Sequence, residues 1–434
     1  MSETITLTKR APVTGSYDVV VAGGGVAGVA AAVSAAMEGR KTALIERQGC
    51  FGGTATLGYV NPISGFFHQG KRVVGGIAWE IVRRLEQRGA AQVELPKGHV
   101  SAHPEDFKLV LQQLLRESGV TLYTNAYLSG CVQEDGRITH LVMESKSGTE
   151  AVAARCVIDA TGDADVCRCA GVPMMAGEDE YQPMSLCFVL EGVDVSTPLL
   201  RDYIHHDGKN GHGSCQQEIH RYLEECVAAG KLRQFGGPWF NTMVHGNALT
   251  VNMTRIAADA ADRADCTHAE MILREDMFEI VRLLQAKYPE FRDCSIVSSG
   301  VNAGVRETRR IDGVGMVRAE TFTVRPECPV ARCAHPMDMH KASSAGQTLI
   351  RLDEPGYVPH TALIPKGIGN LLAAGRCICA DEASFASLRV QATLMAIGEA
   401  AGVMAAMHCE SGMPVQETDA SDLARRIDRR GSVL

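Results

Sequence analysis

The stretch YDVVVAGGGVAGVAAAVSAAMEGRKTALIE, residues 17–46, decides the fold of this chain. It opens with the β-branched run Tyr17–Ala22, passes through a glycine-rich turn into the alanine-rich segment Ala27–Glu38, and closes with the apolar run Lys41–Glu46. These lengths and compositions predict a buried strand, a helix and a second buried strand. Such a unit has a right-handed crossover and is the building block of a parallel α/β sheet.

The turn between the first strand and the helix has the spacing of a dinucleotide-binding loop. Gly23, Gly25 and Gly28 form GxGxxG, and Val26 and Ala27 lie between the last two glycines. The first glycine of such a loop makes the turn, the second lets the backbone approach a pyrophosphate, and the third lets the helix pack closely on the strand. The helix N-terminus adds unpaired N–H groups and the positive end of a dipole. We therefore expect these five residues to bind a dinucleotide.

Glu46 supports this interpretation, because it is an acid at the end of the second strand. A carboxylate at that place accepts hydrogen bonds from the ribose hydroxyls of the adenosine and disfavours a 2′-phosphate. A tight structural turn would explain the three glycines as well. It would not explain the position of the acid.

Further segments have small or polar residues where a strand is expected to end. They are Arg47, Gly52, Gly53 and Thr54 after the second strand, then Ala160, Thr161 and Gly162, and finally Gly375 and Arg376. A ligand that meets all of these strand ends must be extended. This favours FAD over NAD, and we expect these residues to line it.

The remaining segments extend this unit and add a second one. His103–Ser118 has acids in its first turn and apolar residues at helical spacing, as in a crossover helix. Short runs broken by Asp-Gly and Ser-Gly pairs across Val120–Gly162 predict antiparallel hairpins that end in a buried strand at Cys156–Ala160. Strand or helix patterns follow at Met184–Val189, Leu249–Met253, Thr267–Lys287, Asn370–Gly375 and Arg389–Met407.

We therefore predict an α/β fold with a discontinuous Rossmann FAD-binding domain, residues 17–170 and 370–434. A β-meander interrupts this domain. Residues 171–369 form a second, α+β substrate domain, and residues 1–16 form an N-terminal extension.

The composition narrows the classes of function and partner. The chain has 434 residues, 45% of them hydrophobic, and a formal net charge of −8. This charge argues against a nucleic-acid partner, which needs a basic surface, and no window approaches the about 20 apolar residues of a membrane span. Fifteen Cys and no apolar leader in residues 1–16 favour a reducing compartment, so we expect a cytoplasmic protein. The sequence leaves open whether the chain forms a homo-oligomer.

Six segments resemble the FAD-dependent oxidoreductase family whose nucleotide fold is of the glutathione-reductase type. They are VVVAGGGVAGVAAA (19–32), CVIDATGDAD (156–165), GVRETRRIDG (304–313), HPMDMH (335–340), IPKGIGNLLAAGRCICADEAS (364–384) and GEAAG (398–402). The resemblance spans nearly the whole chain and implies a glutathione-reductase-type fold that holds FAD. It also implies a C-terminal helix that begins near Leu388 under the flavin, where a helix N-terminus stabilises reduced flavin by about 0.3 to 1 kcal/mol.

The chain departs from several relatives of this fold in two respects. They carry a redox disulfide or a second GxGxxG unit for NAD(P)H, whereas Cys50 stands alone here and the glycines at 313–315 lack a flanking strand and helix. We therefore expect a small-molecule substrate to supply the electrons, which leave to oxygen, a quinone or an electron-transfer protein. The C-x-C pairs at 167–169 and 377–379 lack a second pair at zinc-site spacing, so no metal is expected.

Histidines and arginines of the second unit are the candidates for substrate chemistry, because ligands of such proteins bind between the domains. His340, His335 or His360 could take a hydroxyl or amine proton while the flavin takes the hydride. His340 is preferred because it closes the HPMDMH segment. Arg306 and Arg309 could hold a substrate carboxylate. The alternatives are structural, hydrogen-bonded histidines and arginines that pair with neighbouring acids.

Together these features predict an FAD-dependent dehydrogenase or oxidase. It would take a hydride from a C–H next to a hydroxyl or amine of a small polar substrate. The substrate could be an anion. Two alternatives stay open. The first is a non-redox flavoprotein, that is a lyase, hydratase or isomerase, and the second is a flavin electron-relay subunit of a larger complex. Reduction of the flavin by a small substrate separates them from the dehydrogenase.

Overall fold

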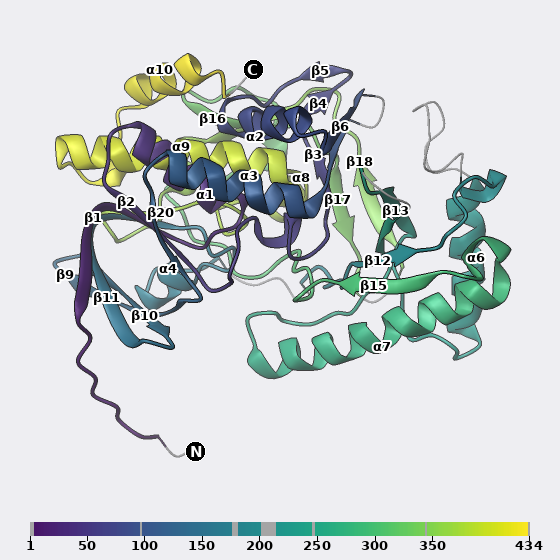
Figure 1. Ribbon diagram of the computed structural model, residues 1–434. Helices are drawn as coiled ribbons and strands as arrows, with labels where there is room; N and C mark the ends of the chain where they lie inside the picture. The colour runs from purple at the N-terminus through teal and green to yellow at the C-terminus, as the bar shows by residue number, and fades with distance from the viewer. Residues whose placement is uncertain are drawn as a thin grey trace.

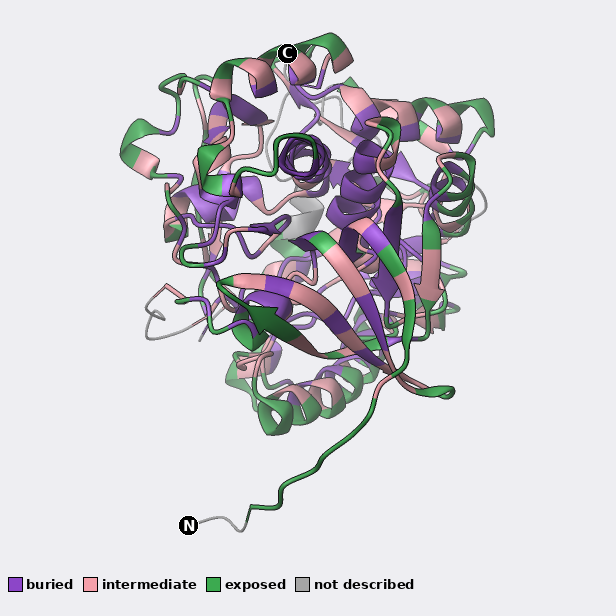
Figure 2. Ribbon diagram, turned by 90° about the vertical axis from the view of Figure 1, so that its left-hand side faces the viewer, coloured by how far each residue is buried: buried purple, intermediate pink, exposed green. Residues whose placement is uncertain are grey.

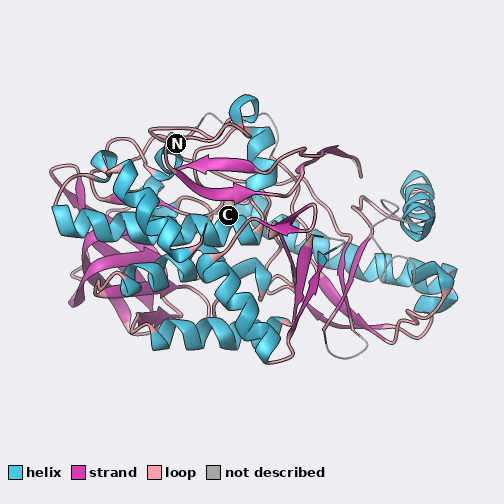
Figure 3. Cartoon of the chain, turned by 90° about the horizontal axis from the view of Figure 1, so that it is seen from above, coloured by secondary structure: helices cyan, strands magenta, loops and turns pink. Residues whose placement is uncertain are grey.

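The structure is a computed structural model. It describes residues 4–95, 98–175, 181–200, 214–244, 248–342 and 345–432. It is a mixed α/β fold with two main sheets. Seen from above, the strands of these sheets gather toward opposite ends of the molecule, and helices run between them (Figure 3).

The first sheet combines a parallel core with an antiparallel extension. Its strand order is β8-β2-β1-β11-β10-β9, and β20 also pairs with β11. The bounds are β1 Val13–Ala22, β2 Thr42–Glu46, β8 Thr121–Thr124, β9 Tyr127–Glu134, β10 Arg137–Ser145, β11 Gly148–Asp159 and β20 Leu371–Ala373. The pairs β1–β2, β2–β8, β1–β11 and β11–β20 are parallel, whereas β9, β10 and β11 form antiparallel pairs. The predicted βαβ unit and the predicted hairpins are thus parts of one sheet.

Strand β11 joins the two parts of this sheet. Residues 148–153 of β11 pair with β10, and Val157, Ile158 and Asp159 pair with β20. The sequence predicted hairpins that end in a separate buried strand, but one continuous strand serves both, because its exposed beginning runs into a fully buried end. The first strand is also longer than predicted and begins at Val13.

Most of the helices near the first sheet lie together on one side of it (Figure 1). The bounds are α1 Val26–Met37, α2 Gly76–Gln87, α3 Pro104–Glu117, α4 Asp165–Cys169, α8 Glu382–Leu388, α9 Gln391–Ser411 and α10 Ala420–Arg430. The predicted helices at 27–38 and 103–118 therefore lie within one residue of α1 and α3 at each end. The predicted helix at 389–407 is α9, which begins two residues later and ends four later.

Helices α1 and α9 cross with their backbones almost in contact. A Cβ added at Gly398 would lie 2.0 Å from the carbonyl oxygen of Ala27, and one added at Gly402 would lie 2.4 Å from that of Ala31. The hydroxyl of Ser34 donates a hydrogen bond of 2.7 Å to the carbonyl of Glu399 across the same contact. Only glycine leaves room for such packing, because protein interiors contain few voids.

Helix α9 is rich in apolar residues and is buried along most of its length. Among the described residues it is the one helix long and apolar enough to cross a membrane by length and composition, and 94% of that apolar window is buried inside the structure. Such burial is typical of a central core helix. In Figure 2 the interior helices are coloured as buried, and exposed residues gather on the outer helices and the N-terminal tail.

The second sheet has its own hydrophobic core. Its strand order is β13-β14-β12-β15, and helices α6 Ser214–Ala228 and α7 Arg263–Lys287 pack beside it. The strand bounds are β12 Phe188–Glu191, β13 Trp239–Thr242, β14 Leu249–Asn252 and β15 Ser295–Ser299. The buried hydrophobic side chains of this core run from Met184 to Ala303, whereas those from Ile311 onward pack on the first core. The second core is therefore shorter than the predicted domain 171–369, whose limits stay a prediction.

Four small sheets lie between or beside the two cores. They are β3-β7-β6, β4-β5, β16-β19 and β17-β18. The bounds are β3 Pro62–Ser64, β4 Phe67–His68, β5 Lys71–Arg72, β6 Ala91–Glu94, β7 His99–Ala102, β16 Pro329–Cys333, β17 Met337–His340, β18 Gln347–Ile350 and β19 Gly356–Pro359. The β17-β18 hairpin carries the HPMDMH segment toward α8.

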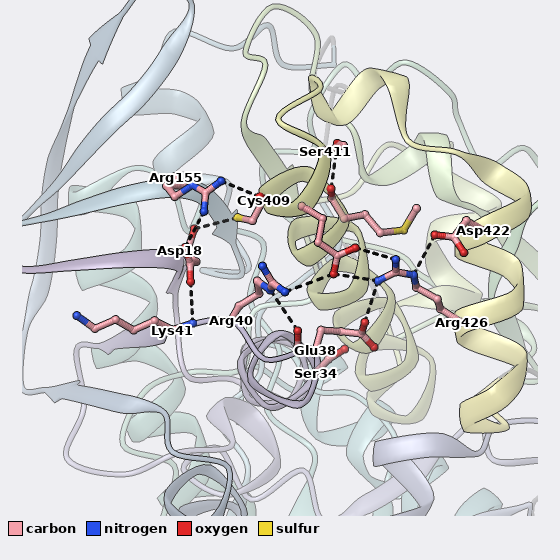
Figure 4. A network of polar contacts seen from close by, with 12 residues as sticks. Asp18, Ser34, Glu38, Arg40, Lys41, Arg155, Cys409, Ser411, Asp422 and Arg426 are labelled. Carbon is pink, nitrogen blue, oxygen red and sulfur yellow. Dashed lines mark hydrogen bonds and ion pairs between the residues drawn. The ribbon is translucent and has the colours of Figure 1, made fainter.

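A polar network fastens the last helix to the first sheet and its helices (Figure 4). Arg426 of α10 pairs with Glu38 beyond the end of α1 at 2.9 Å and with Glu410 of α9 at 2.7 Å. Nearby, Arg155 of β11 pairs with Asp18 of β1 at 3.0 Å and donates to the carbonyl oxygen of Cys409 at 2.7 Å. The contact between α1 and α9 is thus supported at its outer end by ion pairs.

The glycine contact between α1 and α9 predicts that Gly402→Ala destabilises the protein. The added methyl would overlap the carbonyl of Ala31, and overpacking of this kind costs about 1–3 kcal/mol. Thermal unfolding followed by circular dichroism should show a lower melting temperature. Gly130→Ala in β9 is the matched control, because a Cβ there meets no atom within 4 Å. Equal melting temperatures for the two variants would contradict this packing.

Candidate active site

A groove runs along the carboxyl ends of β1, β2, β11 and β20. Most of the residues predicted to bind a dinucleotide line it: Gly23, Gly25, Val26, Ala27, Glu46, Arg47, Gly52, Gly53, Thr54, Ala160, Thr161, Gly162, Gly375 and Arg376. The sheet brings them together because parallel strands end on the same side. Of the predicted set, Gly28 and Leu388 do not line the groove.

The glycine loop leaves the N-terminus of α1 open to this groove. Gly25 is the N-cap of α1, and no side chain caps the helix there. A Cβ added at Gly25 would meet no atom within 4 Å, so this face of the loop is free for a ligand. Gly28 has the opposite environment, because a Cβ there would lie 1.8 Å from the carbonyl oxygen of Gly23. Gly28 thus makes the tight packing of turn and helix possible, as its place in the motif predicts.

The carboxylate of Glu46 is fixed beside the loop. Its Oε2 accepts a hydrogen bond of 2.6 Å from the backbone N–H of Gly24, and its Oε1 accepts one of 2.8 Å from Gln48. A carboxylate has about four acceptor positions, so two remain for ligand hydroxyls. This arrangement fits the adenosine ribose of FAD, and the open helix N-terminus fits its pyrophosphate.

Arg309 is held by Asp165, the first residue of α4. Its guanidinium pairs with Asp165 at 2.7 Å. Arg376 in the same region pairs with Asp163 at 2.5 Å and donates to the hydroxyl of Thr308 at 2.9 Å. Burial would raise the pKa of Asp163, but Arg376 and Thr308 lower it. Arg309 therefore takes the alternative named for it above, a pairing with a neighbouring acid.

Leu388 also differs from its expected place. It is the last residue of α8, is fully buried, and does not open the long C-terminal helix. That helix is α9, whose N-cap is Val390 and lacks a side-chain cap. Arg389 and Leu394, on either side of this N-terminus, do line the groove. The helix start is thus near the predicted position, although Leu388 itself is part of the core.

A second group of polar side chains lies beside the end of the groove marked by Arg389. Arg389 donates a hydrogen bond of 2.8 Å to the carbonyl of Asp338 on β17. Asp338 interacts electrostatically with His335, His340 and Arg306. We call Arg306, His335, Asp338, His340 and Arg389 the polar cluster. It contains three of the five predicted catalytic residues.

His340 is hydrogen-bonded through both of its ring nitrogens. Nε2 lies 3.0 Å from Oδ2 of Asp338, and Nδ1 lies 2.9 Å from a guanidinium nitrogen of Arg255. The indole of Trp239 packs edge-on against the ring at 5.5 Å. Burial lowers the pKa of His340 to about 3, and Arg306 contributes in the same direction. In this arrangement His340 has no free ring nitrogen for a substrate. Its role as the base stays a prediction.

His335 has a different environment. No hydrogen bond to its ring is formed among the described residues, although its carbonyl accepts one from Ser387. Burial lowers the pKa of His335 to about 4; Asp338 opposes this shift, and Arg389 and His99 add to it. The ring is thus neutral at neutral pH and keeps an acceptor nitrogen.

His360 does not join the polar cluster. It follows β19, and its backbone N–H donates to the carbonyl of Cys328 at 3.2 Å. Burial lowers its pKa, and the charged side chain that influences it is Glu327 rather than a residue of the cluster. His360 is close in sequence to the HPMDMH segment, but β18 and β19 lie between them in the chain. This separation could not be predicted from the sequence distance.

Several buried polar atoms at the cluster have no hydrogen-bond partner among the described residues. They are Nδ2 of Asn61, Nε2 of Gln182, Oδ1 of Asp338, Nε of Arg389 and Oε1 of Gln391. Each of these residues contacts its surroundings through another atom, for example Gln182, whose Oε1 accepts from the backbone N–H of His340. Native proteins rarely leave such groups unpaired, and a polar ligand or bound water accounts for them. The cluster is therefore a candidate substrate site.

Sequence reasoning missed Gln182, Arg255 and Gln391 as members of this site. The available signal was weak: Arg255 follows a buried strand, and Gln391 opens an apolar helix. Polar residues at those places are unusual, but nothing local indicates which distant residue they meet.

Comparison with known proteins identifies related sequences and folds. A family model described as FAD dependent oxidoreductase matches residues 18–427. Over 168 residues the chain is 29% identical to dihydrolipoyl dehydrogenase of Trypanosoma brucei brucei, a match that covers 35% of this chain and 31% of that enzyme. A geranylgeranyl bacteriochlorophyll reductase-like protein from Thermoplasma acidophilum has a TM-score of 0.49 at 15% identity, covering 95% of this chain and 82% of its own. A flavoprotein/dehydrogenase from Cytophaga hutchinsonii has a TM-score of 0.45 at 12% identity, covering 95% and 84%.

The open face of Gly25 predicts that Gly25→Ala lowers nucleotide binding without unfolding the protein. The methyl group meets no protein atom but projects into the groove beside the N-terminus of α1. The cofactor content of the purified variant should fall, while its circular dichroism spectrum stays unchanged. Gly49→Ala is the control, because a Cβ there comes no closer than 3.8 Å to another residue and Gly49 does not line the groove. Full cofactor content in Gly25→Ala would show that the loop does not face the ligand.

The two buried histidines predict that stability falls on acidification. In the unfolded chain they bind protons below their ordinary pKa of 6.5, whereas in the folded chain they do so only near about 4 for His335 and about 3 for His340. The unfolded state therefore binds more protons between these values, and the free energy of unfolding decreases as the pH falls from about 6.5 to about 4. Urea unfolding across this range measures the slope. A His335→Gln variant should show a shallower slope, and an identical slope would exclude this contribution.

Proposed function

Because the chain belongs to the FAD-dependent oxidoreductase family and uses FAD, we propose that it oxidises a small polar substrate by taking a hydride from a C–H next to a hydroxyl or amine. The observation that supports this most is the set of unpartnered buried polar atoms beside Arg389, where the cofactor groove meets the polar cluster. A polar substrate there would be adjacent to the cofactor. We also propose a glutathione-reductase-type fold in which residues 171–369 form the substrate domain.

The residues of the groove would hold the cofactor as follows. The N–H groups at the start of α1 would bind the pyrophosphate, and Glu46 would accept hydrogen bonds from the ribose. The N-terminus of α9, with Arg389 beside it, would favour negative charge at the ring system. FAD, when bound, supplies a two-electron acceptor for the hydride.

His335 is the better placed acceptor for the proton that leaves the substrate hydroxyl or amine. Its ring is neutral and has no hydrogen-bond partner among the described residues, in contrast to His340. Asp338 beside it would stabilise the imidazolium that forms. His340 would act as a positioning residue, because its two hydrogen bonds tie Asp338 to Arg255.

Anaerobic titration of the purified holoenzyme with small alcohols, hydroxy acids, amines and amino acids tests this proposal. At least one compound should bleach the visible absorption of the oxidised flavin, and readmitted oxygen, a quinone or an electron-transfer protein should restore it. If every compound of these classes leaves the spectrum unchanged at equilibrium, a non-redox flavoprotein or an electron-relay subunit replaces the proposal.

Replacement of the proposed base predicts a specific kinetic effect. His335→Gln should slow flavin reduction by about 100-fold, because general base catalysis contributes about 10²–10⁴, while cofactor content stays the same. In the natural protein the second-order rate constant for flavin reduction, which reports the free enzyme, should fall as the pH drops through about 4, since protonated His335 cannot accept a proton. The rate of the His335→Gln variant should not show this fall. His360→Gln is the control, because His360 lies outside the cluster, and equal losses in both variants would refute the assignment.

A further inference from the structure

The charges of the polar cluster do not balance among the described residues. Arg306 uses one guanidinium nitrogen for two neutral acceptors, the carbonyl of Pro183 and the hydroxyl of Ser185, both at 2.7 Å. Arg389 donates to the carbonyl of Asp338, and its Nε is buried without a hydrogen-bond partner among the described residues. Neither arginine forms an ion pair with a carboxylate within the described part of the chain.

Other arginines of the same region differ in this respect. Arg309 pairs with Asp165 at 2.7 Å, Arg376 with Asp163 at 2.5 Å, and Arg310 with Glu307 at 3.0 Å. These three acids are thus already paired with other arginines. Arg306 and Arg389 stand apart from these pairs as cations whose protein partners are neutral.

The remaining charged groups at the cluster do not compensate for Arg306 and Arg389. Asp338 acts on both arginines, and His340 already binds one of its oxygens. Glu307 also acts on Arg389, but it is paired with Arg310. Arg255 adds a third positive charge, and both histidines are neutral. Burial lowers the pKa of Arg389 to about 10, and repulsion by Arg306 adds to this shift. A buried charge without a counter-charge is costly, so the cluster favours an anionic ligand.

We propose that Arg306 and Arg389 bind a carboxylate of the substrate, which makes the substrate a small hydroxy acid or amino acid. This rests on the proposed function and names its substrate class. A planar guanidinium matches a carboxylate with two parallel hydrogen bonds, and Asp338 nearby disfavours an anion of higher charge such as a phosphate. Asn61 and Gln182, each with an unpartnered buried amide nitrogen, would bind the neutral polar groups of the same molecule.

A bound carboxylate would also adjust the proposed base. Arg389 lowers the pKa of His335, and an anion paired with Arg389 would weaken this effect. The basicity of His335 would therefore rise when the substrate is in place, which brings it closer to the range that suits general base catalysis. The carboxylate itself takes no part in the bond changes.

The experiment uses a carboxylate that cannot be oxidised by the proposed chemistry. Propionate and its uncharged amide, propionamide, are titrated into the purified holoenzyme, and the absorption spectrum of the bound flavin is recorded. Propionate should give a saturable spectral change and propionamide none. In Arg306→Met and in Arg389→Met the dissociation constant of propionate should rise by about tenfold or more. Arg389→Lys, which keeps the charge but loses the planar fork, should lie between these and the natural protein.

Two checks make the result decisive. Arg292→Met, at an exposed position beyond α7, should bind propionate as the natural protein does. Cofactor content and melting temperature are measured for every variant, and if a methionine variant loses FAD, the comparison rests on Arg389→Lys. Absence of a propionate effect, or equal affinity in all variants, would overturn the proposal.

The outcome also separates this inference from the function on which it rests. If a neutral alcohol or amine reduces the flavin but propionate does not bind, the oxidoreductase proposal stands and the carboxylate proposal fails. If propionate binds through Arg306 and Arg389 but no compound reduces the flavin, the anion site stands and the redox proposal fails.

Discussion

The close approach of backbones around α1 is the constraint on which the rest of the structure depends. Gly28 allows α1 to begin directly against the turn at Gly23, and Gly398 allows α9 to cross α1 at Ala27. A methyl group added at either glycine would clash with the facing backbone and prevent the contact. As a result the N-terminus of α1 meets the strand ends with its N–H groups uncovered, which is the condition for binding a pyrophosphate through the main chain.

Helix α9 links the cofactor groove to the polar cluster. Its buried length fixes it against α1, and the turn before it places Arg389 at the groove and within hydrogen-bond distance of Asp338. The same element would thus contribute both to holding the cofactor and to the proposed substrate site. Because α8 and the β17-β18 hairpin pack together, the histidines of the HPMDMH segment come to that point from a distant part of the chain.

The sequence predicted the parts of the structure that local pattern determines. The βαβ unit, the hairpins, the crossover helix α3 and most groove residues follow from periodicity, glycine spacing and strand-end chemistry. It did not predict which side chains become partners across the fold. Arg309 and Arg306 belong to one short motif, yet one pairs with Asp165 and the other enters the polar cluster. His335 and His340 likewise share a motif, yet among the described residues only the ring of His340 is hydrogen-bonded, to Asp338 and to Arg255. Such differences depend on long-range packing, which leaves no periodic signal in the sequence.

The most direct test of the account compares two flavins on the apoprotein. FAD and FMN carry the same ring system, but FMN lacks the adenosine and the second phosphate. Glu46 and the start of α1 would provide the contacts for these two groups. Quenching of flavin fluorescence during titration measures both affinities. We expect one FAD bound per chain and binding of FMN weaker by about 100-fold or more. Equal affinity for the two flavins, or no uptake of FAD, would contradict it.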